Sequence, residues 1–256
     1  MFMNIHPTAI VKDGARLAPS VEVGPYAIIC ENVAIGEGTV VQAHAFIDGH
    51  TTIGRDCKIF PFACVGMPTQ DLKYNGGTTY AEIGDGTTLR EFSTVHLGTR
   101  DGEVTRVGKN CLVMAYCHIA HGCEVGNDVI MSNSAMLAGE VKVEDKAVIS
   151  GMLGVHQFCR IGTMSMTGAS RVTQDVPPYM LVGREPAEVI GLNLVGLQRR
   201  GVPEESIAAL KKAFRIIWRE GLNRSNAIAK VRETIFGCPE VDHLLEFIET
   251  SQRGVL

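Results

Sequence analysis

The chain lacks several features that would place it in a common functional class. Its 256 residues hold one tryptophan and 6% aromatic residues, and no apolar run approaches the ~20 residues of a membrane-spanning helix. There is no phosphate-binding loop, no dinucleotide fingerprint and no G-x-S-x-G nucleophile elbow. A net charge of −4 argues against bulk binding to nucleic acid. We therefore expect no nucleic-acid partner, no stable membrane insertion and no cofactor.

A secretory signal is also missing from the opening residues, MFMNIHPTAIVKD, because no charged segment leads into a long apolar core. The expected location is therefore cytoplasmic. The chain contains eight cysteines. In a long chain without a secretory signal, they favour free thiols over a disulfide framework.

An aliphatic side chain instead recurs at every sixth position over most of the stretch from Ile5 to Ile161. The first unbroken series is Ile5, Val11, Leu17, Val23, Ile29, Ile35, Val41, Ile47, Ile53, Ile59 and Val65. No helix or alternating strand has this period. Three six-residue units close a triangular turn of about 18 residues, and such turns stack at the ordinary strand spacing of ~4.8 Å. The pattern predicts a parallel β-helix over residues 1–185.

Five of the cysteines share one column of this repeat, two residues before the aliphatic position. They are Cys57, Cys111, Cys117, Cys123 and Cys159. Small apolar side chains suit such a stacked inner column, so we expect buried core residues and not metal ligands.

The six-residue series lapses twice, at 67–80 and 99–106, and resumes in phase at Ile83 and Val107. These polar segments are expected to be loops projecting from the coil, where a rigid scaffold often carries function. The alternative is that they are simple solvated insertions, and function is favoured over it for the first segment only.

A helical period replaces the repeat in the last part of the chain, after Pro177 and Pro178. Helices are expected from Pro203 to about Gly221, at 226–236 and at 239–250, within a C-terminal helical domain over 186–256. Residues 199–256 carry ten basic and eight acidic side chains, which favours this surface for an acidic partner.

Candidate catalytic residues gather in the stretch Tyr116–Gly122. His118 and His121 flank the inward Ile119 and are expected to point outward, where an imidazole can transfer protons near neutral pH. An 18-residue turn stacks His121, Gly139 and Gln157 within ~10 Å. This arrangement suits acyl transfer, because the base can activate a hydroxyl and the backbone N–H can stabilise the oxyanion. The alternative is that both histidines are surface residues without a chemical role. A zinc site formed by His96, His118 and His121 is disfavoured by its H-x-x-H spacing.

Six motifs occur in a family-specific order: HPTAIV at 6–11, QDLKY at 70–74, HIAH at 118–121, SGMLGVHQF at 150–158, QDVPPY at 174–179 and GLQRRG at 196–201. Together they resemble the acyl-acyl-carrier-protein:UDP-N-acetylglucosamine O-acyltransferases of lipid A biosynthesis. The resemblance implies a left-handed β-helix, a homotrimer, and transfer of a 3-hydroxyacyl chain from acyl carrier protein to the 3-hydroxyl of UDP-N-acetylglucosamine.

The same resemblance implies individual roles. His121 is the general base and the Gly139 N–H is the oxyanion donor. Substrate-binding roles fall on Gln70, Asp71, Lys73, His96, His118, Gln157, Asn193, Arg199 and Arg200. The 67–80 loop is expected to reach a neighbouring subunit. A basic face of Lys211, Lys212, Arg215 and Arg219 suits the acidic carrier protein.

Three residues depart from the family pattern. Gly122 replaces an aspartate that often follows the catalytic histidine, Glu140 replaces a histidine after the oxyanion glycine, and Val195 replaces an acidic residue. We hypothesise that Glu140 restores a negative charge near His121. Gly168 or Ala169 sets the acyl length in this interpretation, and the sequence does not distinguish them.

Three other functions are compatible with parts of the pattern. An enzyme of the same fold acylating a 3-amino sugar nucleotide would give an amide, and a non-catalytic scaffold would leave HIAH and QDLKY unexplained. The sister N-acyltransferase of the pathway is disfavoured because it carries an additional N-terminal domain, whereas this repeat begins at Ile5.

Overall fold

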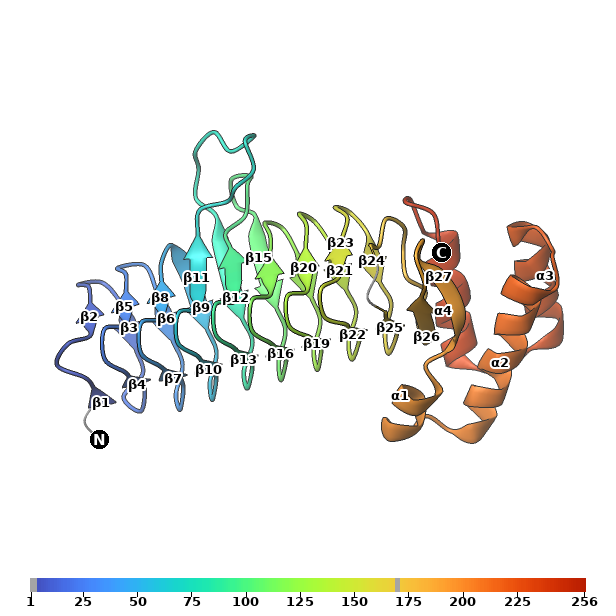
Figure 1. Cartoon of the computed structure of the whole chain (residues 1–256), viewed down its shortest axis with the longest axis horizontal. Helices are drawn as coiled ribbons and strands as arrows, with labels where there is room; N and C mark the ends of the chain where they lie inside the picture. Colours follow the sequence, from blue (N-terminus) through green and yellow to red (C-terminus); the bar gives the residue numbers. More distant parts are fainter. Residues whose placement is uncertain (1–3, 169–170) are drawn as a thin grey trace.

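The computed structural model describes residues 4–168 and 171–256 and shows a long three-sided coil that ends in a group of helices (Figure 1). The predicted fold class, a left-handed parallel β-helix followed by a small helical region, is confirmed. Most strands are two residues long, because each six-residue unit supplies only one short side of the triangle.

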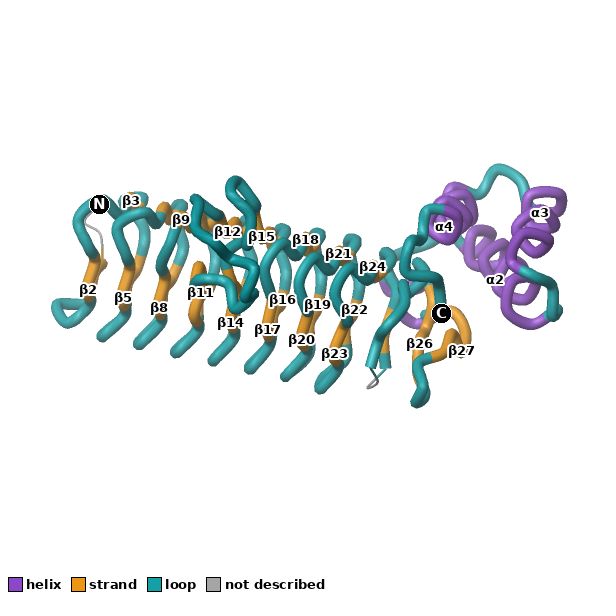
Figure 2. The backbone as a smooth tube through the Cα atoms, turned by 90° about the horizontal axis from the view of Figure 1, so that it is seen from above, coloured by secondary structure: helices purple, strands orange, loops and turns teal. Residues whose placement is uncertain are grey.

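The strands form three sheets that run the length of the coil (Figure 2). The first is β1 (Asn4–Ile5), β4 (Glu22–Val23), β7 (Val40–Val41), β10 (Lys58–Ile59), β13 (Thr88–Leu89), β16 (Leu112–Val113), β19 (Ile130–Met131), β22 (Val148–Ile149), β25 (Met166–Thr167), β26 (Met180–Gly183) and β27 (Glu188–Leu192). The second is β2 (Ile10–Val11), β5 (Ile28–Ile29), β8 (Phe46–Ile47), β11 (Cys64–Met67), β14 (Thr94–His96), β17 (His118–Ile119), β20 (Met136–Leu137) and β23 (Gly154–Val155). The third is β3 (Arg16–Leu17), β6 (Ala34–Ile35), β9 (His50–Ile53), β12 (Tyr80–Ile83), β15 (Val104–Val107), β18 (Glu124–Val125), β21 (Lys142–Val143) and β24 (Arg160–Ile161).

The register between neighbouring turns explains why the six-residue aliphatic pattern resumes in phase after each excursion. Leu112 pairs with Ile130, one turn of three repeat units further along, as the repeat predicts. Lys58 pairs with Thr88 across the first excursion, and Thr88 pairs with Leu112 across the second. The first of these turns is longer than an ordinary one by two repeat units, and the second by one. Because both excursions add whole units, the aliphatic side chains stay inside.

The predicted cysteine column lies in the core. Cys57, Cys111, Cys117, Cys123 and Cys159 are each at most 2% exposed, and all eight cysteines are free thiols. Burial raises the pKa of the Cys123 thiol to about 12, which keeps it protonated and unreactive.

The two excursions leave the coil side by side (Figures 1 and 2). The first lies between β11 and β12, and the second spans 97–103, between β14 and β15. The predicted loop at 99–106 ends too late, because residues 104–106 already pair with β12. The Thr78 N–H donates to Asp101 Oδ1 at 2.7 Å, and the Gly102 N–H donates to the Thr78 carbonyl at 2.8 Å. These hydrogen bonds hold the two excursions together.

The C-terminal region begins with an antiparallel hairpin of β26 and β27, which the sequence did not predict. The helices are α1 (Leu194–Arg199), α2 (Glu204–Arg219), α3 (Arg224–Thr234) and α4 (Pro239–Glu249). The last three match the expected helices, whereas α1 was not expected. The predicted boundary at 185/186 falls inside the hairpin.

The side chain of Arg160 connects the coil to α4. Arg160 pairs with the fully buried Asp175 at 3.0 Å, donates to the Phe247 carbonyl at 2.6 Å and lies over the Phe247 ring. None of the helices in the described part of the chain is long and apolar enough to cross a membrane.

Candidate active site

A cleft of about 670 Å³ opens beside the second sheet, at the foot of the first excursion. Eight of the eleven residues singled out in the sequence line it. They are Gln70, Asp71, Lys73, His96, His118, His121, Gly139 and Gln157. The fold thus gathers on one surface residues that are far apart in the chain, from Gln70 to Gln157.

His121 and Gly139 are stacked in close contact in the cleft. Each follows a strand, β17 and β20, at the same corner of successive turns. A Cβ built on Gly139 would collide with Nε2 and Cε1 of His121 and lie 3.0 Å from its Cδ2. Only glycine leaves room for the imidazole at this level. Within the described residues, the Gly139 N–H has no hydrogen-bond acceptor and is therefore free to donate into the cleft.

Asp71 approaches the imidazole from the first excursion. Its Oδ2 lies 3.6 Å from His121 Nε2, and its other oxygen accepts the Lys73 N–H at 3.0 Å. The Asp71 N–H donates to Thr69 Oγ1 at 3.1 Å, and Thr69 is hydrogen-bonded to Thr99 of the second excursion. Both excursions therefore fix the position of the Asp71 carboxylate.

His118 and His96 form an uncharged edge of the cleft. The two rings meet edge to face with centroids 4.7 Å apart, and His118 Nδ1 is 2.7 Å from Thr94 Oγ1. Burial, together with the neighbouring His96 and His121, lowers the pKa of His118 to about 4. Burial also lowers the pKa of His96. Both imidazoles are therefore neutral hydrogen-bonding groups at pH 7.

Three predicted binding residues lie away from this cleft. Asn193 is 7% exposed and caps α1, accepting from the Gly196 N–H at 3.1 Å and donating to the Met164 carbonyl at 2.9 Å. Arg199 is exposed at the end of α1, and Arg200 donates to the Asp128 carbonyl at 3.4 Å. Their predicted contact with substrate stays a prediction.

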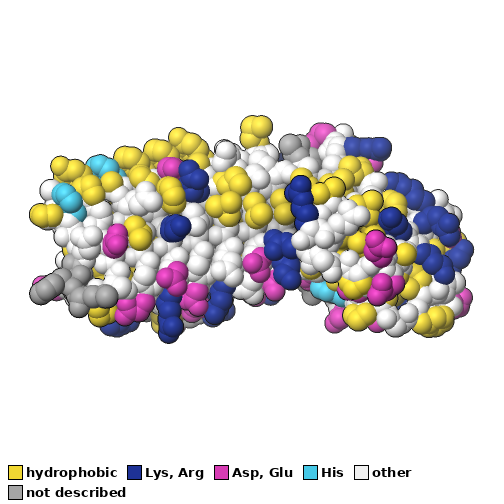
Figure 3. All heavy atoms as spheres, turned by 90° about the horizontal axis from the view of Figure 1, so that it is seen from below, with side chains coloured by type: hydrophobic (Ala, Val, Ile, Leu, Met, Phe, Trp, Pro, Cys, Tyr) yellow, Lys and Arg dark blue, Asp and Glu magenta, His cyan; other side chains and the backbone are white. Residues whose placement is uncertain are grey.

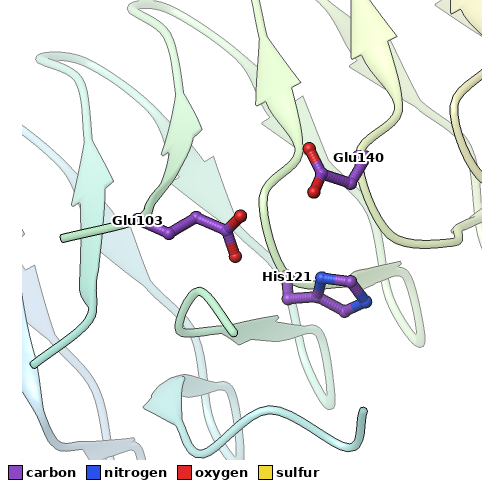
Figure 4. A group of neighbouring side chains, drawn as sticks. All are labelled: Glu103, His121 and Glu140. Carbon is purple, nitrogen blue, oxygen red and sulfur yellow. The ribbon is translucent and has the colours of Figure 1, made fainter. Parts of the chain in front are cut away.

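An acidic group that the sequence only partly suggested lies on the other side of His121 (Figure 4). One ring nitrogen of His121 and one carboxylate oxygen each of Glu103 and Glu140 lie within 4.8 Å of one another. Arg100 binds both carboxylates. Glu140 agrees with the hypothesis of a negative charge near His121. Both Glu103 and Arg100 were missed. Counting one 18-residue turn back from His121 would have led to Glu103, because β15 and β18 pair at that spacing, whereas Arg100 lies on the excursion itself, where no repeat places it.

This group resembles a metal site in its donor types. Its carboxylates already share the guanidinium of Arg100, which supplies the positive charge that a cation would bring. Within the described residues, the ring nitrogens of the three histidines considered as zinc ligands do not all come close enough together to hold one metal ion.

The four basic residues predicted to face an acidic partner all lie exposed on α2: Lys211, Lys212, Arg215 and Arg219. Figure 3 shows lysine and arginine side chains gathered over the helical end of the molecule. The coil body carries both charges in alternation on the same view.

Comparisons with known proteins agree along the whole chain. The family model "Udp N-acetylglucosamine O-acyltransferase; Domain 2" matches residues 175–256, and "Bacterial transferase hexapeptide (six repeats)" matches 105–139. An acyl-[acyl-carrier-protein]–UDP-N-acetylglucosamine O-acyltransferase from Thermodesulfovibrio yellowstonii is 48% identical over 98% of both chains. The same enzyme from Verminephrobacter eiseniae is 48% identical over 99% of both. A solved UDP-N-acetylglucosamine acyltransferase from Bacteroides fragilis superposes with a TM-score of 0.96 at 40% identity, covering 98% of this chain and 99% of that one.

Proposed function

The chain belongs to the acyl-[acyl-carrier-protein]–UDP-N-acetylglucosamine O-acyltransferases, and from this premise we propose how its cleft performs the reaction. It is an O-acyltransferase of the first step of lipid A biosynthesis. The finer proposal is that the acceptor is the 3-hydroxyl of the glucosamine and the donor a 3-hydroxyacyl thioester of the carrier protein. The non-catalytic scaffold considered from the sequence is set aside by this membership.

The chemistry rests on the stack of His121 beneath Gly139. His121 Nε2 removes the proton from the acceptor hydroxyl as its oxygen attacks the thioester carbon. The resulting oxyanion accepts a hydrogen bond from the Gly139 N–H, which has no other acceptor within the described residues. When the intermediate collapses, the C–S bond breaks and the proton on His121 passes to the leaving thiolate. The exclusion of any side chain at position 139 is the observation that carries this assignment.

The cleft is lined by the polar side chains of Gln70, Asp71, Lys73 and Gln157, which suit the hydroxyl and amide groups of a sugar nucleotide. His96 and His118 stay neutral and can hydrogen-bond without adding charge. Asn193, Arg199 and Arg200 act in the cleft of a neighbouring copy, in a homotrimer. Arginine pairs of this kind suit a diphosphate because a guanidinium binds phosphate in a bidentate manner.

The acyl chain follows the outer surface of the second sheet, away from His121. The cleft continues past Gly154 into a second hollow of about 530 Å³ that Met152 and Arg171 line. Of the two candidate rulers, Gly168 donates its N–H to the Val182 carbonyl at 2.6 Å, and Ala169 lies outside the described residues. The exposed basic residues of α2 dock the acidic carrier protein in the cytoplasm.

Product analysis by mass spectrometry tests this assignment. The enzyme is incubated with a panel of 3-hydroxyacyl carrier proteins and either UDP-N-acetylglucosamine or its 3-amino analogue. We expect a hydroxylamine-labile ester on UDP-N-acetylglucosamine. An amide formed only from the amino analogue would replace the proposed acceptor, and no product from either would refute the function.

A further inference from the structure

His121 has one ring nitrogen whose hydrogen-bonding partner is missing. In the described residues, Nδ1 is the one buried side-chain nitrogen or oxygen of a non-exposed residue without any partner. A base that accepts a proton at Nε2 carries its own proton on Nδ1, so Nδ1 must donate. Buried donors of this kind are almost always satisfied, and an exception calls for an explanation.

The glutamate pair faces this nitrogen. Nε2 is directed to Asp71 and to the empty Cβ position of Gly139. Figure 4 shows one ring nitrogen of His121 turned towards the carboxylates of Glu103 and Glu140, with the other turned away. Because Nε2 faces the cleft, the nitrogen that faces the glutamates is Nδ1.

The two glutamates differ in whether a carboxylate oxygen is still available to accept a hydrogen bond. Glu103 Oε1 accepts from Arg100 Nε at 2.9 Å and from Nη2 at 2.7 Å, while Oε2 accepts backbone N–H groups of Thr99 and Arg100. Glu140 uses Oε1 for Arg100. Its Oε2 has no partner among the described residues. Glu140 is therefore the carboxylate with an oxygen to spare.

The backbone also directs Glu140 towards His121. Glu140 lies one turn above Gly122 with a φ of +62°, and its N–H donates to the His121 carbonyl at 3.0 Å. A Cβ built on Gly122 would lie 3.2 Å from Glu140 Cδ and 3.3 Å from Glu103 Cδ. Because residue 122 is a glycine, the two glutamate carboxylates can occupy the space that a side chain at this position would fill.

We propose that Glu140 is the positioning residue of the base: its carboxylate accepts the Nδ1 proton of His121, and Arg100 and Glu103 hold it in place. This inference rests on the proposed function. A ring nitrogen of His121 and a carboxylate oxygen of Glu140 already lie within 4.8 Å of each other, and the proposed contact closes this gap. The contact fixes the tautomer with a free Nε2 and stabilises the imidazolium formed during attack, and Arg100 offsets the repulsion between the two carboxylates.

Steady-state kinetics of Glu140→Gln test the proposal. The amide keeps the shape but loses the charge, so we expect kcat to fall about 100-fold while both KM values stay within about twofold. Glu124→Gln is the matched control, because Glu124 is exposed and pairs with Lys142 at 3.0 Å on the neighbouring sheet. Unchanged kcat in folded Glu140→Gln overturns the proposal.

A relocated carboxylate separates positioning from a merely structural role. Glu140→Ala should lose kcat like Glu140→Gln, and adding Gly122→Asp should restore it at least tenfold, because the new carboxylate enters the same space. Aspartate tolerates the φ of +64° at this position. Failure of rescue in a folded double variant counts against the proposal.

Two further outcomes keep the test decisive. If Glu140→Gln does not fold, Arg100→Met on the exposed excursion releases Glu140 instead, and unchanged kcat in that variant also overturns the proposal. If the wild-type enzyme makes no product, the proposed function fails. If wild type is active, His121→Ala inactive and Glu140→Gln unimpaired, only this inference fails.

Discussion

The carboxylate of Asp71 lies 3.6 Å from Nε2 of His121, although the two residues are far apart in the chain. Nε2 is also the atom that must receive the proton of the acceptor hydroxyl. The Asp71 carboxylate can only accept hydrogen bonds and so cannot donate to the Nε2 lone pair. A sugar hydroxyl that donates to Nε2 therefore displaces this contact, and Asp71 is left to accept a hydrogen bond from the substrate. The first excursion therefore lines the cleft of its own chain, and its predicted reach to a neighbouring copy stays a prediction.

Asp71→Asn should weaken acceptor binding more than chemistry. Losing a charged hydrogen bond to a sugar hydroxyl costs about 1.5–3 kcal/mol, so KM for UDP-N-acetylglucosamine should rise about tenfold or more. The KM for the acyl carrier protein should not change. Asp13→Asn, on the exposed first turn, is the control. Equal rises in both KM values would show that the variant disturbs the excursion as a whole.

Gly139→Ala should disable the enzyme without unfolding it. The added methyl group meets the His121 imidazole and displaces the base from the attacking hydroxyl. A misplacement on the order of 1 Å costs about 100-fold in rate, so kcat should fall by about that factor. Gly191→Ala serves as control because nothing lies within 4 Å of the added Cβ. Normal turnover in Gly139→Ala would contradict the stacked arrangement.

Acid sensitivity should depend on His118. Its pKa is about 4 in the folded protein and 6.5 in its ordinary state, so the unfolded chain binds more protons between those values. Stability is therefore intact above about pH 6.5 and falls as the pH drops towards 4, by no more than about 3 kcal/mol from this group. Urea denaturation at pH 6.5 and 4.5 should show a smaller loss for His118→Gln than for wild type.

His243 provides a control of opposite sign. A hydrogen bond to Glu144 raises its pKa, so its contribution is present at low pH and is lost as the pH rises through the raised value. His243→Gln should therefore become less stable than wild type at pH 4.5. If His118→Gln and wild type lose equal stability on acidification, His118 is not the neutral buried group that the structure indicates.

Charge reversal on α2 should affect the donor alone. Lys211→Glu combined with Arg215→Glu removes the attraction for an acidic carrier protein and adds repulsion. We expect KM for the acyl carrier protein to rise about tenfold at low salt and the difference to shrink at 0.5 M salt. An unchanged KM for UDP-N-acetylglucosamine would show that the variant is still folded. A donor KM that does not change would move the docking surface elsewhere.

The sequence predicted the coil and most of the cleft for one physical reason. A six-residue period fixes which residues stack, so Gly139 and Gln157 follow from His121 by counting one turn of three repeat units at a time. Glu140 was singled out only as a departure from the family pattern, although the same count places it over Gly122. The repeat also placed the five-cysteine column inside, where the structure finds it.

Features that depend on contacts outside the repeat were not predictable. Arg100 reaches Glu140 from an excursion, whose path depends on contacts with the other excursion such as Thr78 to Asp101. Glu103, in contrast, lies one 18-residue turn before His121 and could have been found by counting back. The β26–β27 hairpin extends a parallel sheet with an antiparallel strand, which no period in the sequence signals. The cap that the Asn193 side chain forms on α1 was not predicted either, and its expected contact with substrate stays a prediction. A cap and a ligand-binding amide have the same sequence signature.

Acyl transfer by wild type and His121→Ala is the most direct test of the central claim that His121 beneath Gly139 is the catalytic base. Both proteins are first compared by circular dichroism and size-exclusion chromatography, and then incubated with 3-hydroxyacyl carrier protein and UDP-N-acetylglucosamine. The account predicts an O-acyl product from wild type and a rate lower by about 100- to 10,000-fold in the folded variant. Near-normal turnover by His121→Ala would contradict it.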